Sequence, residues 1–268
     1  MSSRMQLDLT WLAGAAALIE PAYWTARGTR DASLPLAIPE ANDRAEVPRK
    51  VGRRFEDVHR YALERTPGVR VLAANETLRA ERRTLGEVDV LYRHEGVVVH
   101  REVAIKYYLA ARPGREASAW VGPGRRDRLD LKLERLATHQ TTLARRAKAM
   151  NAWPDHLPFP ERTEVLLLGA LFSPPEDIRL PEHANADIEH GRWYEATDFR
   201  ARFGAERWAI LEKPWWLSPQ HARHAPVVRA AALAESLRGP RFVCRIRSPD
   251  ERAFVVPDGW WKDLPSAQ

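Results

Sequence analysis

Four ionisable residues stand in a stretch that otherwise has the pattern of buried β-strand. Residues 86–108 read GEVDVLYRHEGVVVHREVAIKYY and carry Glu87, Asp89, Glu102 and Lys106 among their apolar residues. Buried charges are costly unless they pair with one another or hold a metal ion. These side chains therefore either reach solvent at the rim of a sheet or form a site.

The chemistry that these residue types would support is metal-assisted hydrolysis. Asp89 and Glu102 lie on two strand candidates joined by a short turn, and directly opposite side chains of a hairpin are about 5 Å apart. Two carboxylates that close are both ionised only with a cation between them, and oxygen ligands suit Mg²⁺ or Mn²⁺. The two-residue period places Lys106 on the face of Glu102, where it could assist a water or a phosphate. Glu56, on a preceding helix, could add a third carboxylate. The alternative is a set of solvated carboxylates, or an ion pair with Lys106 or Arg101.

The elements that must position these residues follow the order α-β-β-β-α-β. Apolar spacing predicts a helix over 53–66 and strands over 69–78, 86–93 and 97–109. A long helix, roughly Asp127 to Met150, and an apolar strand over 162–172 complete the set. Hairpin-linked strands with one helical crossover predict an α/β fold with a mixed sheet and helices on its faces.

Three regions are expected along one domain. Residues 1–50 are predicted to be an N-terminal helix and a surface linker packed on the core, which spans 51–175. Residues 176–268 are predicted to be an irregular extension, rich in tryptophan and proline, with six of the ten tryptophans. Those tryptophans are either packing anchors, which we favour, or platforms on which bases stack.

A glycine- and arginine-rich loop is a candidate contact for phosphate. The stretch GPGRRDRLDLK at 122–132 places Arg125, Arg126 and Arg128 before a helix, where guanidinium and backbone N–H groups could bind a phosphate. The alternative is a helix N-terminus capped by Asp127 with solvated arginines.

Composition narrows the class of protein. A net charge of +6 is compatible with DNA or RNA as a partner. Cys244 is the only cysteine, so a disulfide framework and a cysteine-based zinc site are excluded. No stretch has the roughly 18 apolar residues of a membrane span, and we expect a cytoplasmic protein without membrane contact. Neither a G-x-S-x-G nor a G-x-G-x-x-G motif is present. The oligomeric state is not indicated.

The helix with Glu56, followed by GEVD and EVAIK, resembles the core of the PD-(D/E)XK nuclease superfamily, also described as restriction-endonuclease-like. The resemblance covers about residues 52–172. It implies that Asp89, Glu102 and the backbone carbonyl of Val103 would bind Mg²⁺ or Mn²⁺. It also implies that Glu56 is the helix carboxylate of many members and that Gln140 matches the helix glutamine of some branches.

The position of the lysine departs from that superfamily pattern. The superfamily has lysine two residues after the glutamate, where this chain has Ala104. Lys106 stands two residues further on, on the same face and about 6.6 Å along the strand. Because migrated lysines occur within the superfamily, Lys106 is the candidate for the catalytic cation.

Nearly the full length also resembles a narrower bacterial group, the domain of unknown function 1853 family. The stretches GRRFE, GEVDVL, HREVAIKYYL, WVGPGRRDRLDLKLERLATHQ, EKPWWLSP and RAFVVPDGW carry this resemblance. It implies the nuclease-like core but no assigned activity. We expect a metal-dependent nuclease acting on DNA or RNA. The alternative is a catalytically inactive nuclease-fold protein that binds nucleic acid or another protein, and the direction of Lys106 discriminates between them.

Overall fold

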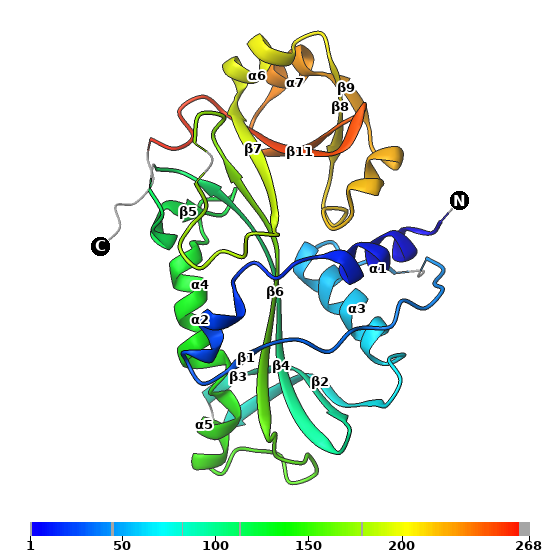
Figure 1. The fold of residues 1–268 in the computed structure, drawn as a ribbon, viewed down its shortest axis with the longest axis vertical. Coiled ribbons are helices and arrows are strands. Elements are labelled where there is room, and N and C mark those ends of the chain that lie inside the picture. The colour runs from blue at the N-terminus through cyan, green and yellow to red at the C-terminus, as the bar shows by residue number, and fades with distance from the viewer. Residues whose placement is uncertain (1, 44–45, 82, 113, 178, 263–268) are drawn as a thin grey trace.

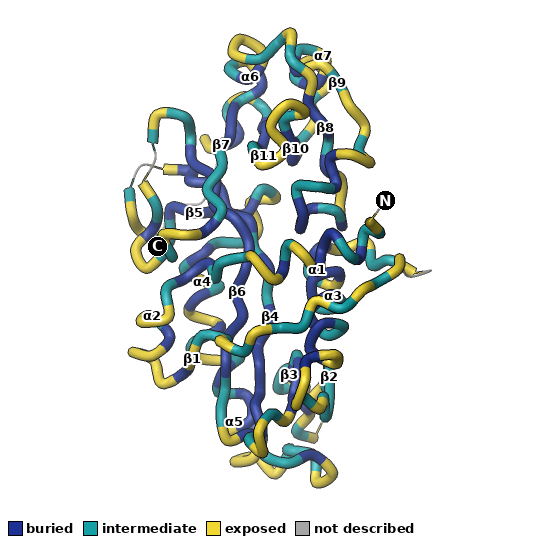
Figure 2. Tube along the Cα trace, turned by 45° about the vertical axis from the view of Figure 1, so that its right-hand side comes forward, coloured by how far each residue is buried: buried dark blue, intermediate teal, exposed yellow. Residues whose placement is uncertain are grey.

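Two long parallel strands form the centre of the molecule. In the computed structural model, which describes all residues except 1, 44–45, 82, 113, 178 and 263–268, β4 (Val97–Ala110) pairs with β6 (Arg162–Ser173) along almost their whole length (Figure 1). Nearly every residue of β6 is buried, because helices and loops cover both faces of this part of the sheet (Figure 2). The apolar run at 162–172 is thus confirmed as a central strand.

The sheet is mixed and extends to both sides of this pair. Its strand order is β2 (Val69–Ala80), β3 (Arg83–His94), β4, β6, β7 (Glu189–Glu195), β11 (Ser248–Val256), β10 (Arg241–Arg245), β8 (Arg207–Leu211) and β9 (Val227–Arg229), with β1 (Arg30–Asp31) beside β6 and β5 (Trp120–Val121) beside β4. Strands β2, β3 and β4 form antiparallel hairpins, and β4 to β6 is a parallel crossover. The predicted order α-β-β-β-α-β is therefore present.

Helices cover the two faces of the β4–β6 pair separately (Figure 1). On one face, α1 (Arg4–Gly14) and α3 (Val51–Leu63) pack against alternate residues of β4 such as Ile105. On the other face, α2 (Pro21–Thr25) and α4 (Leu129–Arg135) pack against residues such as Tyr108. Glu102 shares the two-residue phase of Tyr108, so its side chain belongs to the α4 face.

The helix predicted from Asp127 to Met150 is not one continuous α-helix. It consists of α4, a π-helical turn η2 (Leu136–Gln140) and α5 (Leu143–Ala149). Three threonine hydroxyls in this segment donate to backbone carbonyls: those of Thr138, Thr141 and Thr142. Such hydroxyls compete with the regular helical bonds, and apolar spacing alone does not show the resulting change of phase.

The C-terminal region is not irregular, which corrects the sequence-based prediction. It continues the sheet with β7 to β11 and adds α6 (Ala196–Phe203), the 3₁₀ turn η3 (Pro219–His224) and α7 (Ala230–Ser236). Strands β8, β9 and β10 have five residues or fewer, so no clear alternation marks them in the sequence.

Most tryptophans of the C-terminal region are packing anchors. Trp193, Trp208, Trp216 and Trp260 are buried, whereas Trp261 is 44% exposed. The Trp208 ring lies edge-on to two phenylalanine rings of α6. Burial of these rings accounts for them without invoking base stacking.

The N-terminal region is also part of the body. Its helix α1 packs on α3 as expected, and Ser3 accepts a hydrogen bond from the Gln6 backbone N–H at its start. The segment predicted to be a linker contributes β1, which pairs in parallel with β6 at Glu164 and Val165. None of the described helices is long and apolar enough to cross a membrane.

Candidate functional site

The candidate site lies where the β3–β4 hairpin stops pairing. The ladder runs from His94 opposite Val97 to Val90 opposite Arg101, and the next pair in this register would be Asp89 and Glu102. Instead of a further backbone pair, the Asp89 carboxylate accepts a hydrogen bond of 2.9 Å from the Val103 backbone N–H. The turn length thus brings the two carboxylates to adjoining positions, as the sequence predicts.

Glu102 is fully buried. Its Oε2 accepts a hydrogen bond of 2.5 Å from the Gln140 amide, which comes from the π turn. Its Oε1 lies 2.9 Å from His100 Nε2, but without hydrogen-bond geometry. Among the described residues, Glu102 Oε1 and both His100 nitrogens therefore have no hydrogen-bond partner. A buried carboxylate oxygen left in this state has unused capacity to bind a cation.

Burial and the neighbouring Glu102 carboxylate raise the pKa of Asp89 to about 8. The hydrogen bond from Val103 opposes this rise without cancelling it. At neutral pH and without a cation, the Asp89 carboxyl is mostly protonated. A cation placed between the two groups would reverse this, because opposite charge favours the ionised form.

A lysine that sequence reasoning missed faces these carboxylates. Lys132, on α4, donates a hydrogen bond of 2.9 Å from Nζ to Gln140 Oε1. Burial, followed by the nearby Lys106 charge, lowers the pKa of Lys132 to about 8, while Glu102 and Asp89 oppose the fall. Lys132 and Gln140 are eight residues apart, but the π turn between them changes the helical phase, so regular helical spacing does not indicate their contact.

The predicted catalytic lysine points elsewhere. Lys106 Nζ lies 2.5 Å from Asp127 Oδ2, in the loop before α4, and its side chain is 30% exposed. The ion pair directs the ammonium toward that loop and away from the space between the carboxylates. Lys106 still lies close enough to Lys132 to influence its pKa.

Glu56 borders the site from α3. It forms an ion pair with Arg53 at 2.6 Å, and Arg53 also approaches Glu87 at 3.5 Å. Burial nevertheless raises the pKa of Glu56. A cavity of about 10 Å³ separates Glu56 from Asp89 and is bordered by Val103 as well. That volume is about one water-sized sphere.

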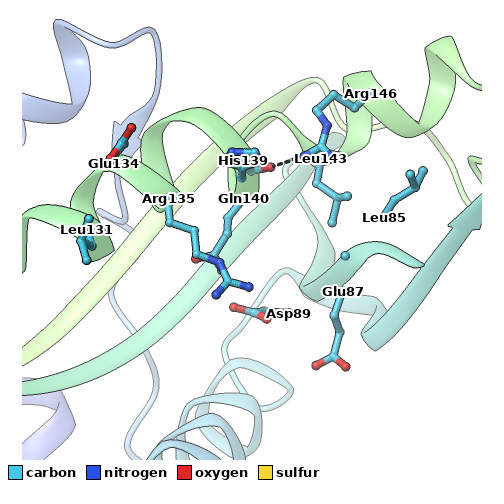
Figure 3. Close-up of a pocket in the computed structure, with 11 residues that line it drawn as sticks. Leu85, Glu87, Asp89, Leu131, Glu134, Arg135, His139, Gln140, Leu143 and Arg146 are labelled. Carbon is cyan, nitrogen blue, oxygen red and sulfur yellow. Dashed lines mark hydrogen bonds between the residues drawn. The ribbon is translucent and has the colours of Figure 1, made fainter. Parts of the chain in front are cut away.

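On the α4 side, Asp89 opens into a larger pocket of about 650 Å³. Figure 3 shows Arg135 and Gln140 reaching from the helical segment toward Asp89, while Glu87 points away from it. Arg146 also borders this pocket and donates a hydrogen bond of 3.2 Å to the His139 carbonyl. The pocket therefore offers the guanidinium groups of Arg135 and Arg146 beside the Asp89 carboxyl group, whereas Glu102 does not border it.

The three loop arginines lie outside this pocket. Arg125 donates to the Trp260 carbonyl at 3.1 Å, and Arg128 makes two bonds to Asp130 at 2.7 and 2.9 Å. Arg126 is exposed. The structure thus brings together Asp89, Glu102 and Gln140, with Glu56 at the edge, but it does not bring the loop arginines to them.

The donor set fits a hard divalent cation. Within the described residues, no group of three or more histidine, cysteine, aspartate or glutamate side chains could hold a metal ion. Two carboxylates with an orphaned oxygen, beside the Val103 backbone, leave most of a coordination sphere to water. Mg²⁺ is commonly held by one or two carboxylates and several waters, whereas structural zinc needs four protein ligands.

The chain belongs to the family described as "Domain of unknown function (DUF1853)", whose model matches residues 7–241. No curated protein and no solved structure gives a significant match to this chain.

Proposed function

We propose that this protein is a metal-dependent phosphodiesterase that hydrolyses DNA or RNA at Asp89 and Glu102. The observation that supports this most is the pair of adjoining carboxyl groups, with Glu102 buried, Asp89 opening into a pocket and Lys132 held beside them through Gln140. A carboxyl group whose pKa is raised by burial and by a neighbouring carboxylate is typical of a functional site. The resemblance to the PD-(D/E)XK superfamily is consistent with this chemistry.

Each residue has a role in the proposal. Asp89 and Glu102 would hold a Mg²⁺ or Mn²⁺ ion, which when bound supplies positive charge for an anionic phosphate and activates a water. Lys132, in place of Lys106, stabilises charge that develops on the phosphate. Gln140 orients both partners, since its amide donates to Glu102 and accepts from Lys132. Glu56 is auxiliary.

The test compares two lysines. Lys132→Met should lower the cleavage rate by about 10²–10³, a typical loss for removing a group that stabilises transition-state charge. Lys106→Met, the matched control, should cleave at close to the wild-type rate. The measurement is a Mn²⁺ or Mg²⁺ cleavage screen over single- and double-stranded DNA and RNA, with calorimetric metal binding on each variant. A folded wild type that binds neither ion contradicts the proposal.

The second candidate is a nuclease-fold protein that binds nucleic acid without cutting it. The observation that favours it is the Lys106–Asp127 ion pair, which removes the strand lysine from the site. Metal binding and nucleic-acid binding without cleavage by the wild type would select this function.

A further inference from the structure

A second hollow lies on the other side of the α5 segment. Its volume is about 490 Å³, and its border carries four arginines and one glutamate, a local net charge of about +3: Arg27, Arg30, Arg145, Arg162 and Glu161. We call it the arginine hollow. Like charges gather there at an electrostatic cost that an anion would relieve.

Two of these arginines are available to a ligand. Arg30 and Arg145 are exposed, and neither forms an ion pair with any described residue. Arg162 Nε is buried without a hydrogen-bond partner in the described part of the chain, at 3.4 Å from Glu164. The Glu161 carboxylate accepts a hydrogen bond from the Val98 backbone N–H, which occupies one of its oxygens.

The remaining arginine is partly held by its own helix. Arg27 donates to the Tyr23 carbonyl at 3.0 Å and stacks 3.6 Å above the Tyr23 ring. A guanidinium that stacks on a ring by its face keeps the N–H groups at its edge accessible to solvent. The hollow therefore combines a fixed guanidinium with two freely placed ones, a donor set suited to phosphate oxygens.

The arginine hollow and the candidate active-site pocket share one helical segment. Gln140, Leu143 and Arg146 border the pocket that contains Asp89, whereas Ala144 and Arg145 border the hollow. A helix is about 10 Å across, and phosphates of one stacked strand are about 3.4 Å apart along the axis. The two sites thus flank one helical segment, whose width is within the reach of a strand of a few nucleotides.

We propose that the arginine hollow binds backbone phosphates of the same nucleic-acid strand whose scissile phosphate enters the Asp89 pocket. The second half of this inference, that the scissile phosphate of the same strand enters the Asp89 pocket, rests on the proposed function. The strand crosses the α5 segment, with Arg30, Arg145 and Arg162 contacting phosphates on the far side. The recessed position of Asp89 suits a single strand, which can enter a 650 Å³ pocket where a duplex cannot.

The experiment compares two double variants with the same loss of charge. Arg30→Gln/Arg145→Gln removes the exposed arginines of the hollow, and Arg229→Gln/Arg238→Gln removes two exposed arginines of the C-terminal region. Fluorescence anisotropy measures binding of labelled single-stranded DNA and RNA in EDTA over a salt series. The hollow variant should bind several-fold more weakly. Its negative slope of log K against log salt should become shallower by about 1.4, because two phosphate contacts of about 0.7 each are lost.

The outcomes separate this proposal from the proposed function. Equal affinities and slopes for the two double variants overturn the arginine hollow as a phosphate site, as does a wild type that binds neither oligonucleotide. Calorimetric Mg²⁺ binding at Asp89 should be unchanged in the hollow variant. Loss of oligonucleotide binding in that variant, with no metal binding in the wild type, supports the hollow while contradicting hydrolysis.

Discussion

Two clusters of charged residues lie on opposite faces of β4, and they are built in opposite ways. On the α1 and α3 face, the Asp8 carboxylate contacts Arg54 at 2.7 Å through one oxygen and His221 at 2.7 Å through the other. On the α4 face, Asp89 adjoins another carboxylate, and the cation of that face bonds to an amide. The first cluster joins three distant segments through the Asp8–Arg54 ion pair and the contact of Asp8 with His221. The second places two carboxyl groups side by side, and their repulsion is relieved by protonation of Asp89 or by a cation.

Breaking the first cluster should have the largest effect. Asp8→Ala leaves Arg54 buried and without its carboxylate, because both side chains are about 1% exposed. The free energy of unfolding should fall by about 3–5 kcal/mol, as for other broken buried pairs. Urea denaturation at pH 7 measures this change. A loss no larger than that of a surface substitution would show that the cluster is not the structural one.

Removing the Asp89 carboxylate from the second cluster should raise the free energy of unfolding, in contrast to the loss expected for Asp8→Ala. Asp89→Asn keeps an oxygen for the Val103 N–H and removes a carboxyl whose pKa rises from 3.8 to about 8 on folding. Because folding raises this pKa, the wild type loses stability as pH increases from about 4 to 8, and the variant does not. The variant should therefore be the more stable protein at pH 8.5, and the difference should grow by up to about 1.4 kcal/mol per pH unit between pH 4 and 8.

Denaturation at pH 5, 7 and 8.5 checks this dependence. The difference between Asp89→Asn and wild type should grow with pH and become constant above pH 8. A variant that is less stable than wild type at every pH would place Asp89 in the structural class with Asp8.

A smaller effect should appear in metal affinity. A cation must displace the Asp89 proton, so apparent Mg²⁺ affinity should rise by up to about tenfold per pH unit below pH 8 and become constant above it. Calorimetry between pH 6 and 9 measures the slope, with Asp89→Asn as the control that should not bind. Affinity independent of pH would show that the ion does not bind at Asp89.

The sequence predicted those parts of the fold and site that depend on local pattern. The strands around Asp89 and Glu102 follow from alternation, and their juxtaposition follows from the short turn between them. Gln140 came from the superfamily resemblance and does contact Glu102.

The parts that were missed depend on contacts between segments. Lys106 turns to Asp127 because the loop after β4 folds back over it, which no pattern in either segment indicates. Lys132 reaches Gln140 across a π turn, which changes the helical phase after Leu136. The short C-terminal strands are held by their neighbours in the sheet and not by their own alternation.

The tight turn between β3 and β4 has a consequence for how this protein can vary. Because side chains alternate along a strand, a one-residue insertion or deletion between His94 and Val97 would turn Asp89 to the opposite face from Glu102. The hairpin would still fold, with its charges exchanged between faces. The length of this turn must therefore be kept in evolution as strictly as the two carboxylates themselves. Homologues with a turn of different length should have lost the site.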